Sequence, residues 1–168
     1  SMADRWILPR LQRTSQEVDQ ALEAYRLNDA AQALYRFFWH ELCDWYIELA
    51  KPRMARPDGA AARATLLHVL DRLTRLMHPI MPFVTEELWQ RLPRPSSRPE
   101  MIVTAPFPRA DFDGRADGAA DGSMRLVQAV ISAVRTIRAE HELKPQVVLP
   151  VLLRTDNAES RALLEAER

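Results

Sequence analysis

Residues 28–54 are the segment that most limits how this chain can fold, because their apolar side chains repeat at helical spacing and are too many for one buried face. The apolar residues at steps of three and four are Leu34, Tyr35, Phe38, Leu42, Trp45, Tyr46 and Leu49. Those that fall elsewhere around the helix are Phe37, Trp39 and Ile47. Asn28 is suited to cap the start of the helix, and Pro52 is expected to end it. The segment predicts a long helix that is either central to a bundle or partly exposed to a partner.

Three further segments each carry one apolar stripe at helical spacing, over residues 4–27, 61–78 and 82–92. Asp4 is the predicted cap of the first helix, and Pro82 suits the first turn of the last. Four amphipathic helices joined by short loops predict a mainly α fold, with an antiparallel helical bundle over residues 4–99. Residues 1–3 look like a remnant of tag removal and do not enter this prediction.

The remainder of the chain is predicted to lie outside the bundle. Residues 100–122 read as an extended segment followed by an acidic loop with glycines. A fifth helix is expected at 123–143, followed by a β-strand at 146–153 and a short helix at 157–167. Because that strand has no partner in the sequence, we expect residues 123–168 to hold a helix and a small, truncated α/β element.

Composition and charge place few limits on function. The chain is 47% hydrophobic and 27% charged, as in ordinary globular domains. Lysine and arginine number 23, as do aspartate and glutamate, so any basic surface must come from an uneven distribution of charge. The single cysteine, Cys43, excludes an internal disulfide and favours a reducing compartment. No apolar run reaches the length of a membrane span, so we expect a soluble, cytoplasmic protein without membrane contact.

Residues that could catalyse a reaction or bind a metal are few. His40, Cys43 and Asp44 share one helix, but a zinc site needs three or four ligands and nothing near them in sequence completes the set. His78, directly before Pro79, most simply interacts with the end of its own helix. The four glycines lie in polar loops without the strand and helix that a phosphate-binding loop requires. The sequence predicts no catalytic residue, no metal site and no cofactor site in this chain.

Three stretches carry a resemblance to a known family: DRWILPRLQRT at 4–14, FWHELCDWYIELAKPRM at 38–54 and HPIMPFVTEELWQRLP at 78–93. Together they closely resemble the anticodon-binding region of the valyl-tRNA synthetases, which are class I aminoacyl-tRNA synthetases. The third stretch is also similar to isoleucyl and leucyl enzymes, whereas CDWYIELAKPR is similar to the valyl enzymes more narrowly. The resemblance covers residues 4 to about 154, and Pro9 stands where the family usually has serine.

The resemblance implies a fragment that binds tRNA and performs no covalent step. It implies that bases of the anticodon loop contact the helix around CDWYIELAK, with Ile47 as the favoured base contact. Hydrogen bonds or phosphate contacts would come from the charged neighbours Asp44, Glu48, Lys51 and Arg53. The HIGH-type and KMSKS-type signatures of class I enzymes are absent. ATP, Mg²⁺ and valine would therefore be handled by the catalytic domain of a longer parent chain, which would also supply an editing domain.

Chain direction adds Arg10 and Arg56 to the candidate tRNA contacts. In an antiparallel bundle, the starts of the first and third helices meet the ends of the second and fourth at one pole. The cations expected at that pole are Arg5, Arg10, Arg13, Lys51, Arg53, Arg56, Arg63, Arg91 and Arg94. A chain of zero net charge could thus present a basic pole to valine tRNA.

Two other functions remain open from the residues alone. A helical protein-interaction module would grip a partner protein with Phe37, Trp39 and Ile47. A helical enzyme unrelated to the synthetases would use His40 or His78.

Overall fold

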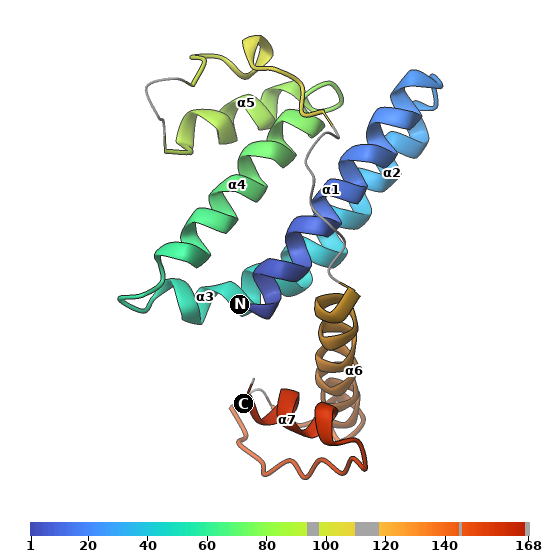
Figure 1. Ribbon diagram of the computed structural model, residues 1–168, viewed down its shortest axis with the longest axis vertical. Coiled ribbons are helices and arrows are strands. Elements are labelled where there is room, and N and C mark those ends of the chain that lie inside the picture. Colours follow the sequence, from blue (N-terminus) through green and yellow to red (C-terminus); the bar gives the residue numbers. More distant parts are fainter. Residues whose placement is uncertain (94–97, 110–117, 145, 167–168) are drawn as a thin grey trace. The chain divides into compact units, whose positions relative to one another are not determined.

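The computed structural model describes residues 1–93, 98–109, 118–144 and 146–166. The chain divides into two compact units, of which the first holds Ser1 and Ala3–Ala116 and the second holds Asp117–Arg168. Both units are helical (Figure 1), so the predicted mainly α class is confirmed. Within the ranges described, no helix combines the length and the apolar character needed to cross a membrane.

Helix α1 runs from Met2 to Glu23 and carries Pro9 inside it. The predicted cap was wrong. Ser1 is the N-cap, and its hydroxyl oxygen accepts a hydrogen bond from the Asp4 amide at 3.4 Å. Asp4 is the third residue of the helix, and its carboxylate accepts from the Ser1 backbone nitrogen at 3.0 Å. Asp4 thereby completes a capping box rather than beginning the helix.

The long helix predicted at 28–54 is present as three consecutive parts. These are α2 (Leu27–Arg36), the π-helix η1 (Phe37–Ile47) and α3 (Glu48–Met54). Asn28 is not the cap, because the amides of Asp29 and Ala30 both donate to the carbonyl of Arg26 and start the helix earlier. Pro52 does not end it either. The helix continues past the lost proline donor, since the Ala55 amide still donates to the Lys51 carbonyl at 3.3 Å.

The π-helix determines which side of this long helix is buried. Phe37, Leu42 and Tyr46 have almost no exposed surface. In an α-helix, Phe37 and Leu42 would point about 140° apart, because each residue advances by about 100°. The i→i+5 bonding of a π-helix widens the turn, so residues five apart return to nearly the same side. Tyr35, which the helical spacing had grouped with the buried residues, is 58% exposed.

Helices α4 (Ala60–Met77) and α5 (Pro82–Arg91) complete the bundle of the first unit, with Pro82 at the start of α5 as predicted. Figure 1 shows α5 beside the end of α4 that is remote from α3. The short 3₁₀ helix η2 (Ile102–Thr104) follows, and its segment is held on the bundle by side chains that donate to its backbone. Trp89 donates to the Pro99 carbonyl at 3.2 Å, and Arg75 donates to the Pro106 carbonyl at 3.0 Å.

The second unit contains α6 (Gly118–Glu140) and α7 (Ala158–Ala166). Helix α6 begins at Gly118 rather than Ser123, so the described end of the predicted acidic loop is helical. The strand predicted at 146–153 is wrong, because those residues are irregular. No neighbouring strand in the described part of this unit offers the hydrogen bonds that a strand needs. The short helix predicted after it is confirmed as α7.

Candidate nucleic-acid interface

The solvent side of α2, η1 and α3 in the first unit carries a continuous line of polar and aromatic side chains. We call it the exposed stripe, and it consists of Tyr35, Trp39, His40, Asp44, Ile47, Glu48 and Lys51. All of these are exposed except Ile47, which is half-buried at the edge of the core. Four of the predicted tRNA contacts, Asp44, Ile47, Glu48 and Lys51, therefore lie together on one surface.

The charged groups of the exposed stripe pair with one another. His40 Nδ1 lies 3.4 Å from Asp44 Oδ2, and the Lys51 ammonium donates to the Glu48 carboxylate. All four side chains are more than half exposed. Pairs of this kind typically contribute no more than about 1 kcal/mol to stability. A ligand that offers comparable hydrogen bonds can therefore replace them at little cost.

Arg53 is placed differently from its neighbours on the stripe. Its guanidinium donates two hydrogen bonds to the carboxylate of Asp4, at 3.1 and 2.6 Å. The hydroxyl of Tyr46, whose side chain is fully buried, donates to the same carboxylate at 2.8 Å. Arg53 thus joins the end of α3 to the start of α1, in an ion pair that no local sequence pattern indicates. Its role as a tRNA contact stays a prediction.

The Asp4 carboxylate is held ionised by this arrangement. Burial alone would raise the pKa of Asp4, but the hydrogen bonds from Arg53, the terminal ammonium, Tyr46 and Ser1 outweigh burial and lower its pKa well below the ordinary range. Burial, together with the hydrogen bond to Asp4, raises the pKa of Tyr46. Tyr46 therefore remains a neutral donor across the working pH range of proteins.

Arg10 also has a partner within the protein. Its guanidinium forms a bidentate pair with Glu41 of η1, with Nε donating to Oε2 at 2.7 Å and Nη2 to Oε1 at 2.5 Å. This pair joins α1 to the π-helix. A phosphate that approached this edge of Arg10 would have to compete with a carboxylate that already accepts from Nε and Nη2.

The starts of α1 and α4 and the end of α3 meet at one end of the bundle, as predicted. Besides the Arg53–Asp4 pair, Arg63 near the start of α4 donates to the Met54 carbonyl at 2.6 Å. We call this region the basic end, and its cations are Arg5, Lys51, Arg53, Arg56 and Arg63. Of the predicted contacts here, Lys51 and Arg56 are exposed.

One part of the predicted pole was wrong. Arg91, at the end of α5, does not reach the basic end, because α5 has 10 residues against 18 in α4 and lies beside the far end of α4 (Figure 1). Arg91 pairs instead with Glu87 at 2.6 Å. Arg94 lies outside the described residues.

The alternatives based on histidine or on a protein partner gain little from the geometry. His78 Nδ1 lies 2.8 Å from the hydroxyl of buried Thr85, so it links the end of α4 to the first turns of α5. Phe37 is 1% exposed, so its predicted contact with a partner protein was wrong. Among the described residues, no group of three histidine, cysteine or acidic side chains could hold a metal ion. The Cys43 thiol is free, and burial followed by the charge of Asp44 raises its pKa.

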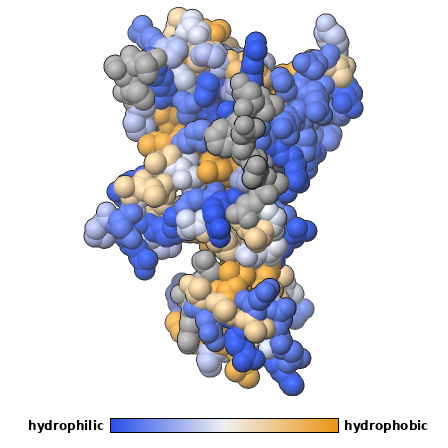
Figure 2. All heavy atoms as spheres, in the orientation of Figure 1, coloured by the Kyte–Doolittle hydropathy of each residue, from blue (hydrophilic) through white to orange (hydrophobic). Residues whose placement is uncertain are grey.

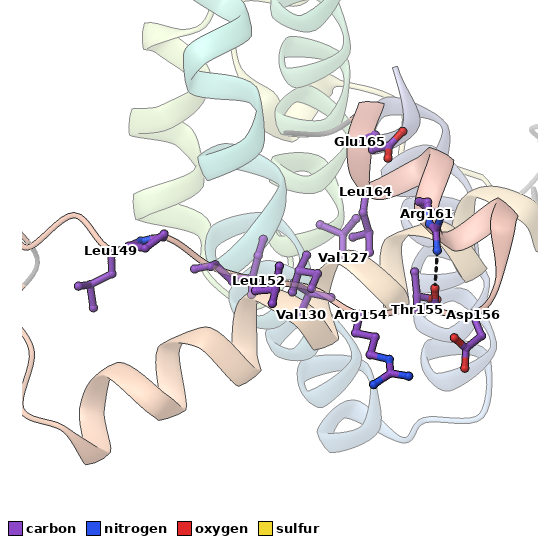
Figure 3. Close-up of a pocket in the computed structure, with 14 residues that line it drawn as sticks. Val127, Val130, Leu149, Leu152, Arg154, Thr155, Asp156, Arg161, Leu164 and Glu165 are labelled. Atoms are coloured by element: carbon purple, nitrogen blue, oxygen red, sulfur yellow. Dashed lines mark hydrogen bonds between the residues drawn. The ribbon is translucent and has the colours of Figure 1, made fainter.

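The second unit contains an open apolar groove of about 1000 Å³. Figure 3 shows Val127, Val130 and Leu164 among its lining side chains, with Arg161 donating to the Thr155 carbonyl at 3.0 Å. In Figure 2, apolar residues gather on the visible face of this unit, whereas the visible surface over α1 and α2 is mainly hydrophilic. The groove has no arrangement of reactive groups and adds no candidate catalytic site.

Comparison with known sequences agrees with the helical architecture. Residues 4–153 match the family described as the anticodon-binding domain of tRNA ligase. The match covers most of the chain. The chain therefore belongs to the family of tRNA ligase anticodon-binding domains.

Two curated relatives narrow the comparison within that family. The chain is 49% identical over 172 aligned positions to the valine-tRNA ligase of Geobacter sulfurreducens, covering 98% of this chain and 19% of that protein. It is 41% identical over 163 positions to the valine-tRNA ligase of Chromobacterium violaceum, covering 94% of this chain and 17% of that protein. The chain thus spans about a fifth of the length of these relatives. The predicted resemblance to the valyl enzymes is confirmed.

Proposed function

We infer that this chain binds valine tRNA through its anticodon loop, as the anticodon-binding part of a cytoplasmic valine-tRNA ligase. The observation that carries the proposal is the exposed stripe, which runs along one helix and ends in the basic end. In the parent enzyme, the catalytic domain would use ATP, Mg²⁺ and valine, and an editing domain would accompany it. The chain itself would contribute recognition and no covalent step.

The chemistry of the exposed stripe suits bases more than phosphates. Asp44 and Glu48 can accept hydrogen bonds from the amino groups of bases, as acidic side chains do from cytosine. Half-buried Ile47 offers an apolar contact to an unstacked base. Phosphates, in contrast, require cations, and these gather at the basic end, where Lys51 and Arg56 are exposed. Base-reading and phosphate-binding groups are therefore separated along one surface.

Titration of the chain with valine tRNA, with a tRNA of different anticodon and with a duplex RNA tests the proposal. We expect tighter binding of valine tRNA than of either control, because duplex RNA hides its base edges and another anticodon offers different ones. Equal affinity for all three RNAs would show that the surface binds phosphate without reading the anticodon. No detectable binding to any of them would overturn the proposal.

A pair of variants separates the two kinds of contact. Replacing Lys51 and Arg56 together by alanine should weaken binding and reduce the salt slope of log K by about 0.7 for each phosphate that is no longer neutralised. Ile47→Ala should weaken binding without changing the slope, because a base contact releases no counterion. Arg91→Ala is the matched control, since Arg91 is also an exposed cation but lies away from the basic end. Arg53 is left unchanged because its removal would strand the Asp4 carboxylate.

A further inference from the structure

An exposed aromatic cluster lies on the stripe, several turns away from Lys51. The ring centroids of Tyr35 and Trp39 are 6.4 Å apart with an interplanar angle of 54°, and those of Tyr35 and His40 are 6.0 Å apart at 79°. The edge of Phe38 also supports Trp39, with centroids 5.3 Å apart at 78°. Tyr35 and Trp39 nevertheless remain 58% and 47% exposed. The rings are thus positioned by one another while much of their surface faces solvent.

This exposure is not a general property of aromatic residues in the first unit. Phe37 and Tyr46 of the same helix are completely buried, as large apolar rings usually are in cores. Phe83 on α5 is exposed but, in the described part of the chain, stacks on no other ring. Several aromatic rings held together at a surface indicate a binding surface more strongly than a single exposed ring does.

The π-helix keeps this cluster in line with the predicted base contact. In an α-helix, residues five apart, such as Trp39 and Asp44, would point about 140° apart, because successive side chains wind around the axis. Across Phe37–Ile47, the wider π turn opposes that winding. Trp39, Asp44 and Glu48 therefore stay on the solvent side, and all three are exposed. Trp39 and Ile47 lie up to about 12 Å apart along the axis at 1.5 Å per residue.

The surroundings of the cluster fit one nucleotide of single-stranded RNA. A base could stack on the face of Trp39, and Asp44 one turn away could accept from an amino group. Arg36, next to Tyr35 in sequence, lines a small polar cleft of about 80 Å³ together with Arg13 of α1. Arg36 pairs with Glu17 at 3.2 Å, but both side chains are about half exposed, so a phosphate can compete for that guanidinium. An aromatic ring for stacking and a cation for the phosphate are the two components that single-strand binding sites combine.

We propose that Trp39, supported by Tyr35 and Phe38, forms a second stacking site for an unpaired base of the same RNA loop that contacts Ile47. This inference rests on the proposed function, because it extends the same stripe. A separation of up to about 12 Å exceeds the step of about 3.4 Å between stacked bases, so the two sites would hold different bases. The anticodon loop would be bound with its bases splayed along the helix.

The test uses the anticodon stem-loop of valine tRNA with the fluorescent base 2-aminopurine placed at each loop position in turn. Binding to the unchanged chain should quench one position through stacking on Trp39, and Trp39→Leu should abolish that quenching. The same variant should weaken stem-loop binding about tenfold, since stacking contributes about 1–3 kcal/mol per base. Its salt slope should not change. Trp39→Phe should retain most of the affinity because it keeps a ring face.

Phe83→Leu is the matched control, since it also removes an exposed ring but lies off the stripe, and circular dichroism verifies that each variant is folded. Suppose that the unchanged chain binds the stem-loop and that replacing Lys51 and Arg56 by alanine weakens this binding, but that Trp39→Leu changes neither the affinity nor the quenching. This inference is then wrong while the proposed function stands. An equally weakened Phe83→Leu would also contradict it. If the unchanged chain binds no RNA, both proposals fail. Acrylamide quenching of Trp39 fluorescence in the RNA complex gives a further check. If the Trp39 ring stays accessible to acrylamide, no base is stacked on it, and the proposed stacking site is wrong.

Discussion

Replacing Arg53 by alanine should destabilise the first unit far more than replacing its neighbour Lys51, although both are cations at the end of the same helix. Arg53 makes two hydrogen bonds to Asp4, whose side chain is 12% exposed. Removing one member of a buried pair typically costs about 3–5 kcal/mol, because the other charge stays buried without its partner. Arg53 itself is 27% exposed, so solvent can partly replace it, and we expect a destabilisation of about 2–3 kcal/mol. Lys51→Ala should cost less than about 1 kcal/mol.

Urea unfolding followed by circular dichroism measures this difference directly. With a slope of about 1–3 kcal/mol per molar urea, the Arg53→Ala midpoint should fall by roughly 1 M, while the Lys51→Ala midpoint should hardly move. Arg53→Met separates charge from packing, because it keeps an apolar stem. Asp4→Asn combined with Arg53→Met should be less harmful than Arg53→Met alone, since no buried charge is then left unpaired.

The pH dependence has a defined sign. The pKa of Asp4 is lower in the folded protein than the value of about 3.9 expected for the unfolded chain. Its contribution is therefore complete above about pH 4 and is lost as the pH falls through the folded pKa. The gap between the unchanged chain and Arg53→Ala should be constant from pH 7 to pH 5 and should narrow in stronger acid. Equal stability of Arg53→Ala and Lys51→Ala at pH 7, or a gap that widens in acid, would refute this account of Arg53.

Four other substitutions test separate features of the structure. Gly59→Ala should destabilise the fold by about 1–3 kcal/mol, because the added Cβ would lie 2.5 Å from the Arg53 carbonyl oxygen and 2.8 Å from that of Met54. A Cβ at Gly122 in α6 would meet nothing within 4 Å, so Gly122→Ala should stabilise by up to about 1 kcal/mol. Thermal melting distinguishes the two outcomes. Tyr25→Gly should raise the melting temperature. Tyr25 has a φ of 56° at the end of α1, a conformation that costs residues with a side chain about 1 kcal/mol and glycine almost nothing. A lower melting temperature would mean that the exposed Tyr25 ring stabilises the fold. Asp44→Asn should speed alkylation of Cys43 at neutral pH, because the Asp44 charge, after burial, raises the pKa of that thiol, and an unchanged rate would assign the shift to burial alone.

The sequence predicts the helices of the first unit well because their signals are local. Apolar spacing defined residues 61–78 and 82–92, and the structure has helices at Ala60–Met77 and Pro82–Arg91. Pro82 begins α5 because its fixed φ and missing donor suit a first turn. These inferences need only neighbours within one or two turns.

The features that were missed depend on residues distant in sequence or on unusual backbone. The Arg53–Asp4 and Arg10–Glu41 pairs join positions separated by 49 and 31 residues, and no local pattern indicates which of many opposite charges will meet. The end of α1 carries the two hydrogen bonds of a Schellman motif, from Arg26 to Ala21 at 2.7 Å and from Tyr25 to Leu22 at 3.0 Å. Because Tyr25 occupies the position where glycine is usual, its sequence signal is absent.

The π-helix explains why the aromatic segment could not be divided correctly between core and surface. An α-helical reading grouped Tyr35 and Phe38 with Leu42 and Tyr46, and left Phe37 and Trp39 to a partner. Phe37, at 1% exposure, continues the buried face that Ala30, Ala33 and Leu34 form on α2. The wider turn that follows brings Leu42 and Tyr46 to the core as well, and Trp39 stays in solvent. The packing that stabilises the first unit is therefore also what holds Trp39 on the same side of the helix as Asp44 and Glu48.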